Sequence, residues 1–169
     1  MPTPNPHPSS NSTLVRGAML IALALVLQAL RLVIPLPRLA SAFIIGTLMH
    51  LMLTLAATRN GRPTALLMGA LLPLFAYLQG QIIISVLVPV VAMGNFSFVL
   101  AVALPRYKWF APVLKTILMA AMALSVLALF GIDNNSISVV VMSLCTPQLV
   151  TGLAGIWLAE KVGKRMGNR

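Results

Sequence analysis

The sequence predicts an all-α integral membrane protein: a bundle of six transmembrane helices with both the N and the C termini in the cytoplasm. Of its 169 residues, 59% are hydrophobic and only 8% are charged. Soluble domains carry about 25% charged residues. The apolar residues fall into stretches of about 15 to 23 residues, near the length that crosses a hydrocarbon core of about 30 Å. In order, the stretches are 17–34, 39–57, 64–78, 82–104, 111–130 and 137–158.

The basic residues predict the orientation. Cytoplasmic connections collect Lys and Arg. All but two of the 12 Lys and Arg residues lie before the first stretch, between the second and third, around the fourth-to-fifth junction, or after the sixth. This division assigns Lys115 to the fourth-to-fifth junction and places Arg31 and Arg38 on the non-cytoplasmic side. We therefore expect a multi-pass protein of the cell membrane, specifically of a bacterial plasma membrane.

The stretches leave room for three segments and no soluble domain. We expect a disordered, proline-rich cytoplasmic tail over residues 1–13, a six-helix membrane domain over 14–165 and a basic C-terminal tail over 166–169. The net charge of +10 lies at the predicted cytoplasmic edges, where it contacts anionic lipid. This placement indicates the lipid bilayer as a partner and argues against nucleic acid.

Proline and glycine interrupt the third and fourth stretches. Pro73 lies in the third, the sequence Gln79-Gly80-Gln81 follows it, and the fourth contains Pro89 and the sequence Met93-Gly94-Asn95. Backbone groups freed at membrane depth have to meet protein or a wet cavity. These two helices are therefore the predicted walls of a cavity.

Three strongly polar residues fall near the predicted bilayer midplane. His50, Asn95 and Gln148 lie about eleven to thirteen residues into their stretches, at about 1.5 Å per residue. A polar group at this depth faces protein and suggests a functional site. The alternative for each is an interhelical hydrogen bond that only holds the bundle together.

A second candidate site lies at the predicted outer face. Arg31 lies one turn inside the outer end of the first helix, and Gln28 lies a turn deeper. The Arg31 side chain can extend to the interface, or, with Arg38, offer a cation to an anionic substrate group. Polar residues of this face could complete such a site, although ordinary loop solvation explains them equally well: Tyr77, Gln79, Gln81, Asn134 and Asn135.

Small residues four apart occur on two helices. They are Ala18 and Ala22 in the first helix, and Thr151, Gly155 and Ala159 in the sixth. Such stripes let helix backbones approach closely in lipid. They could pack within one subunit, but two stripes in the same leaflet favour a partner surface.

The sequence offers little for catalysis. Asp133 and Glu160 are its acidic residues, and they lie at opposite predicted faces. It contains no pair of carboxylates, no cluster with metal-ligand spacing and no glycine-rich phosphate loop. The one conceivable base and nucleophile pair is His50 with Cys145 or Ser143. We therefore expect no enzyme activity, no cofactor and no metal site.

The chain resembles the substrate-binding S components of energy-coupling factor (ECF) transporters over residues 14–165. Six short helices in about 170 residues carry the resemblance. The alanine pair Ala18 and Ala22 in RGAMLIALAL, the stretch VPVVAMGNFSFVL and the stretch TPQLVTGLAGIWLAEKV add to it. The resemblance implies a subunit that binds a vitamin or related small micronutrient near the outer face. Its implied partners are a transmembrane coupling subunit and two cytosolic ATPases.

The resemblance also implies roles for particular residues. Ala18 and Ala22 would dock the coupling subunit. Helices four to six and the outer loops would bind substrate, which on this chain favours Asn95, Asn134, Asn135, Thr146 and Gln148. Few Trp and Tyr residues are present, so a ligand smaller or more polar than a flavin or pterin fits better.

The competing hypothesis is a non-catalytic structural or assembly subunit of a membrane complex. Such a subunit could use the same small-residue stripes without binding a ligand. A polar cavity around Asn95 and Gln148, open to the outer face, would argue against it. A dry and fully packed centre would support it.

Overall fold

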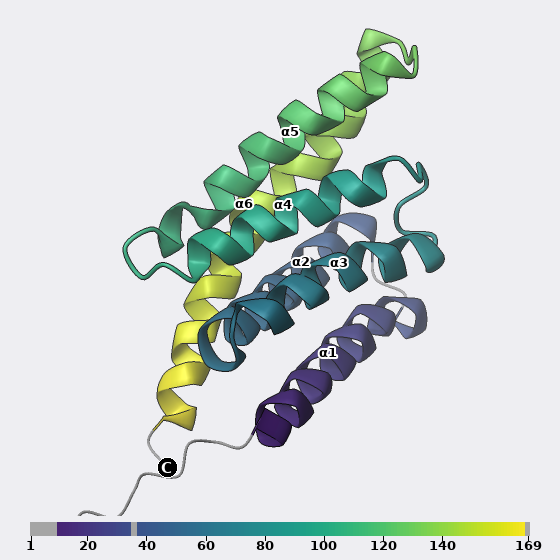
Figure 1. Cartoon of the computed structure of the whole chain (residues 1–169). Helices are drawn as coiled ribbons and strands as arrows, with labels where there is room; N and C mark the ends of the chain where they lie inside the picture. Colours follow the sequence, from purple (N-terminus) through teal and green to yellow (C-terminus); the bar gives the residue numbers. More distant parts are fainter. Residues whose placement is uncertain (1–9, 35–36, 168–169) are drawn as a thin grey trace, which may run out of the picture.

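The computed structural model describes residues 10–34 and 37–167, and the regular structure among them is helical, with no strand (Figure 1). A π-helix, η1 (Ala56–Asn60), extends the second helix, and a 3-10 turn, η2 (Lys108–Phe110), precedes the fifth. The α-helices are α1 (Ser10–Val33), α2 (Arg38–Leu55), α3 (Arg62–Leu78), α4 (Leu87–Val102), α5 (Ala111–Leu129) and α6 (Asn134–Met166).

Several of these helices are long and apolar enough to cross a membrane. In the described part of the chain they are Asn11–Val33, Leu39–Asn60, Lys108–Leu129 and Asn135–Arg165. α3 and α4 are apolar but shorter, about 25 Å each at about 1.5 Å per residue. Large apolar side chains also cover the outside: Val26, Ile117 and Val139 are 63%, 63% and 69% exposed. These features are those of a helical multi-pass membrane protein, because its outward-facing apolar side chains contact lipid instead of water.

The connections alternate between two ends of the bundle (Figure 1). At one end, the start of α1 and the end of α6 meet η1. Asn60 Nδ2 donates to the Thr13 carbonyl at 3.3 Å, and Arg59 Nη2 donates to the Gly163 carbonyl at 2.6 Å. We call this the terminal end. The opposite end, which we call the loop end, holds the connections 79–86 and 130–133.

Basic residues concentrate at the terminal end, where Lys108 also forms an ion pair with Glu160. Among the described residues, Arg31 and Arg38 are the basic residues of the loop end. The charge asymmetry therefore follows the predicted pattern, with one exception. Lys115, assigned from the sequence to a connection, is buried within α5 at 3% exposure.

The ends of the membrane domain differ from those expected. α1 begins at Ser10, inside the expected tail of residues 1–13, and α6 continues to Met166. Residues 1–9 and 168–169 lie outside the described part of the chain. At the loop end, Asp133 caps α6 by accepting from the Ser136 backbone N–H at 2.9 Å, and this hydrogen bond lowers the pKa of the Asp133 carboxyl. The cap explains why α6 begins before the apolar run at 137.

The fourth helix is also shorter than expected. α4 begins at Leu87 rather than at 82, and it then runs unbroken through Gly94 and Asn95. Pro89 explains the start, because it is the third residue of α4. The first four N–H groups of a helix have no intrahelical acceptor, so a proline without an N–H is tolerated there. A helix that began at 82 would place Pro89 in its interior, where it would remove a hydrogen bond.

Glycine brings α2 and α6 unusually close. A Cβ atom on Gly155 would lie 2.5 Å from His50 Cβ and 2.8 Å from the Leu51 backbone nitrogen. Thr151 and Ala159, one turn to either side, are 1% and 4% exposed. The small-residue stripe of the sixth helix is therefore an internal contact, and the expectation of a partner surface there is wrong.

Candidate functional site

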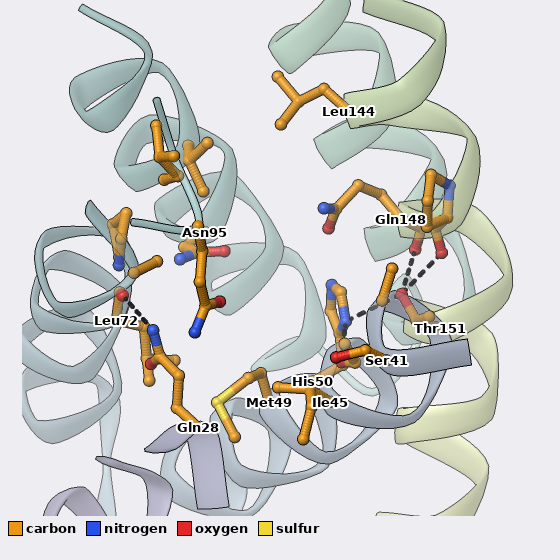
Figure 2. A pocket seen from close by; sticks show the side chains of 18 of the residues that line it. Gln28, Ser41, Ile45, Met49, His50, Leu72, Asn95, Leu144, Gln148 and Thr151 are labelled. Atoms are coloured by element: carbon orange, nitrogen blue, oxygen red, sulfur yellow. Dashed lines mark hydrogen bonds between the residues drawn. The ribbon is translucent and has the colours of Figure 1, made fainter. Parts of the chain in front are cut away.

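A cavity of about 240 Å³ lies at the centre of the bundle. Its lining extends from Thr151 toward the loop end, where it includes Arg31, Gln81 and Ile82. Every α-helix contributes side chains to it, and Figure 2 labels some of those from α1, α2, α3, α4 and α6. One residue from each, in chain order, is Gln28, Ser41, Leu72, Asn95, Lys115 and Gln148. α3 and α4 are walls, as predicted, but α1, α2 and α6 contribute as much.

Asn95 completes the backbone of α3 as well as lining the cavity. Pro73 lies inside α3 and has no N–H, so the Gly69 carbonyl four residues earlier loses its intrahelical donor. Asn95 Nδ2 donates to that carbonyl at 3.0 Å. One hydrogen bond therefore links the asparagine of α4 to the carbonyl that the proline of α3 leaves without a donor.

Lys115 joins Asn95 to His50 at the floor of the cavity. Its ammonium donates to Asn95 Oδ1 at 2.8 Å and lies 2.9 Å from His50 Nε2. The other ring nitrogen, Nδ1, lies 2.8 Å from the Gly46 carbonyl, which can only accept. Nδ1 therefore carries the proton, and Nε2 is the acceptor for Lys115. Both ring nitrogens of His50 are occupied by protein groups.

Three buried polar atoms of the cavity have no hydrogen-bond partner among the described residues. They are Gln28 Oε1, Ser41 Oγ and Gln148 Oε1. Figure 2 shows Gln28 and Gln148 on opposite sides of the cavity, with His50 between them in the view. Gln28 Nε2 donates to the Leu72 carbonyl at 3.0 Å, and this hydrogen bond fixes the orientation of the side-chain amide. Unpaired buried oxygens are rare because each costs about 1–3 kcal/mol, so these three atoms require hydrogen-bond donors from water or from a polar ligand in the cavity.

The structure separates the predicted site residues into two groups. His50, Asn95, Gln148 and Arg31 line the cavity. His50 and Asn95 have all their side-chain polar atoms paired with protein, which favours the interhelical-contact alternative for these two. Gln148 keeps a free oxygen. Arg31 is partly exposed at the mouth of the cavity.

Of the remaining predicted residues, Gln81 lines the cavity, whereas Tyr77, Gln79, Asn135 and Thr146 do not. Thr146 and Asn135 lie on exposed faces of α6, because the helix turns them away from its cavity-lining residues. Gln79 accepts from Gln81 Nε2 and does not line the cavity itself. The side chain of Asn134 is outside the described part of the structure.

Lys115 and Ser41 are polar lining residues that were not identified as site residues from the sequence. Ser41 is 1% exposed near the start of α2. A lysine four residues into an apolar helix is a signal in itself, but it also fits a side chain that extends to the membrane edge. Whether Lys115 points into the bundle or toward the membrane edge depends on the rotation of α5 about its axis, which cannot be predicted from the sequence.

The alanine pair of α1 behaves differently from the stripe of α6. Ala18 and Ala22 are exposed on the outside of the bundle, beside the exposed Met19 and Val26. α1 lies at one edge of the bundle (Figure 1). The prediction that these alanines form an external surface is therefore compatible with their placement.

A scan against protein-family models, a search of curated proteins and a search of solved structures give no match for this chain.

Proposed function

We propose that the chain is the substrate-binding subunit of an ATP-driven importer of the ECF type, which carries a vitamin or related small micronutrient. The central cavity supports this proposal, because it presents three unpaired buried oxygens, one of them from the predicted residue Gln148. A volume of about 240 Å³ suits a metabolite rather than a lipid or peptide.

A structural or assembly subunit is the weaker proposal. A protein that only holds a complex together gains nothing from unpaired polar groups at its centre, because burying them without partners is unfavourable. The presence of a polar cavity around Asn95 and Gln148 favours the binding subunit over a dry scaffold.

In the proposed topology all six helices span a bacterial plasma membrane, with the terminal end in the cytoplasm. The concentration of Lys and Arg at the terminal end supports this orientation. The cavity would then be reached from outside, past Arg31 and Gln81. A coupling subunit would dock on α1 at Ala18 and Ala22, and two cytosolic ATPases would supply the energy.

The proposal is tested by purifying the tagged chain after cross-linking in its native membrane and identifying its protein partners by mass spectrometry. We expect one larger membrane subunit and two ATPases. The double variant Ala18→Leu/Ala22→Leu should lose them because the larger side chains block close helix approach. Ala121→Leu, an exposed alanine of α5, is the matched control and should retain them.

A partner set that contains no ATPase in the cross-linked wild type would contradict the importer. Partners retained by the α1 double variant would leave the importer intact but move the docking surface away from α1.

A further inference from the structure

Among the described residues, Lys115 has no acidic partner near the cavity. The chain has only two acidic side chains, Asp133 and Glu160. Asp133 caps α6 at the loop end, and Glu160 pairs with Lys108 at the terminal end. Of the described residues that line the cavity, none is Asp or Glu, whereas Lys115 and Arg31 are both basic. The cavity therefore has cations at its floor and its mouth and no anion.

The contacts of Lys115 include no anion; besides its hydrogen bonds, the ammonium nitrogen lies over the Phe98 ring, 5.8 Å from the ring centroid, which is a weak cation–π contact. An ammonium has three N–H donors. Two are directed at neutral acceptors, His50 Nε2 and Asn95 Oδ1, and the structure gives no third acceptor among the described residues. A buried cation without an anionic partner is strongly unfavourable. At 3% exposure, on the wall of a cavity, Lys115 is placed to receive an anion from a ligand.

The rest of the lining defines the other end of that ligand. Gln28 Oε1 and Gln148 Oε1 are free acceptors, and the Ser41 hydroxyl is free to donate or accept. Ile45, Met49 and Leu72 supply apolar wall. A complementary molecule has one anionic group, separate N–H or O–H donors, and a short apolar body. The volume equals roughly eight waters at about 30 Å³ each.

We propose that the substrate is a small monocarboxylate with N–H or O–H donors, and that Lys115 binds its carboxylate while Gln28 and Gln148 accept from its donors. This inference rests on the proposed function, because it names the substrate class of the same cavity. A carboxylate suits the site better than a phosphate. Phosphate sites gather several N–H donors or a guanidinium around one group. At the floor, Asn95 Nδ2 and both nitrogens of His50 are already engaged, and the Arg31 guanidinium lies at the mouth of the cavity.

The test compares a panel of small amino- and hydroxy-substituted monocarboxylates with their primary amides. The amides keep the shape and the donors but remove the charge. Binding is measured by calorimetry and by thermal shift on the full chain in mild detergent. At least one carboxylate should bind wild-type protein about tenfold or more tightly than its amide, because a hydrogen bond to a charged group is the stronger kind.

Two variants identify the residue responsible. Lys115→Met and Lys115→Gln should both reduce the carboxylate-to-amide ratio to about one, and the glutamine variant guards against a folding defect of the other. Lys161→Met is the matched control, because Lys161 is exposed on α6, where it lies over Trp157. It should keep the wild-type ratio.

The possible results distinguish a wrong substrate class from a wrong proposed function. A carboxylate preference that both Lys115 variants retain would overturn the inference, as would amides that bind wild type as tightly as acids. Either result leaves a solute-binding subunit in place. If no compound binds, and protein taken from its native membrane carries no metabolite, the substrate class and the proposed function fail together.

Discussion

At the scale of single residues, the site depends on one chain of contacts. The Gly69 carbonyl, which has no intrahelical donor because of Pro73, accepts a hydrogen bond from Asn95. Asn95 in turn accepts from Lys115, whose ammonium lies beside His50. Asn95 on α4 thus supplies the donor that Pro73 cannot provide within α3. Asn95 acts by positioning Lys115, while the atoms left for a ligand belong to other residues.

This arrangement predicts a specific rescue. Asn95→Leu should destabilise the protein by about 1–3 kcal/mol because it leaves the buried Gly69 carbonyl without a donor. In a Pro73→Ala background the same change should cost less, since an alanine at that position would restore the backbone N–H. The measurement is a double-mutant cycle of thermal or denaturant unfolding in detergent.

Pro147→Ala in α6 is the control for that cycle, because Asn95 makes no hydrogen bond to α6 among the described residues. Its effect should add to that of Asn95→Leu. Equal coupling with both prolines would remove the proposed link between Pro73 and Asn95.

Sequence reasoning found part of this site. It placed His50, Asn95 and Gln148 at one depth, and they do line one cavity. Depth follows from counting residues along a helix, which the sequence permits. Which way a residue faces depends on helix rotation and packing, so Thr146 was included although it is exposed, and Lys115 was assigned to the membrane edge although it is buried.

At the scale of helices, the same small-residue spacing has two different uses. Gly155 allows α2 and α6 to touch, whereas Ala18 and Ala22 lie on an exposed face of α1. Nothing in the spacing distinguishes an internal contact from an external one. Most helix boundaries were predicted within a few residues. The exceptions are α1, which begins at Ser10 rather than at 17, α4, which begins at Leu87 rather than at 82, and α6, which continues to Met166 rather than to 158. For α4, the position of a proline in the first turn had to be known.

The two stripes should respond differently to enlargement. Gly155→Ala should lower stability by about 1–3 kcal/mol, or several degrees of Tm, because the added Cβ meets the α2 backbone. Ala22→Leu adds more atoms on an exposed face and should leave the Tm nearly unchanged. Thermal unfolding of both variants in the same detergent checks this. A decrease in Tm for Ala22→Leu as large as that for Gly155→Ala would contradict this, because it would mean that the Ala22 face of α1 is packed against other residues.

At the scale of the whole molecule, the basic charge lies at one end and the central cavity extends toward the other. The terminal end is basic, and the cavity extends toward the loop end. This separation suits a protein that takes up a solute on one side and meets its energy source on the other. The overall helix order could be predicted because apolar length and Lys/Arg placement are both visible in the sequence.

The orientation can be tested by cysteine labelling in whole cells. In a Cys145→Ala background, Ile83→Cys at the loop end should react with a membrane-impermeant maleimide. Arg106→Cys at the terminal end should react only after the cells are permeabilised. Both positions are exposed, so access alone decides the result. Reversed labelling would invert the topology and make the cavity face the cytoplasm.

The most direct measurement of the central claim, that the cavity holds a small solute, is the mass of whatever the protein retains. Wild-type chain, Gln148→Leu and Thr146→Val would be purified from the native membrane in mild detergent and analysed by native and small-molecule mass spectrometry. We predict a metabolite on wild type and on Thr146→Val, whose side chain lies outside the cavity, and its loss from Gln148→Leu. A wild-type protein without any bound metabolite, or a metabolite retained equally by all three proteins, would contradict the account.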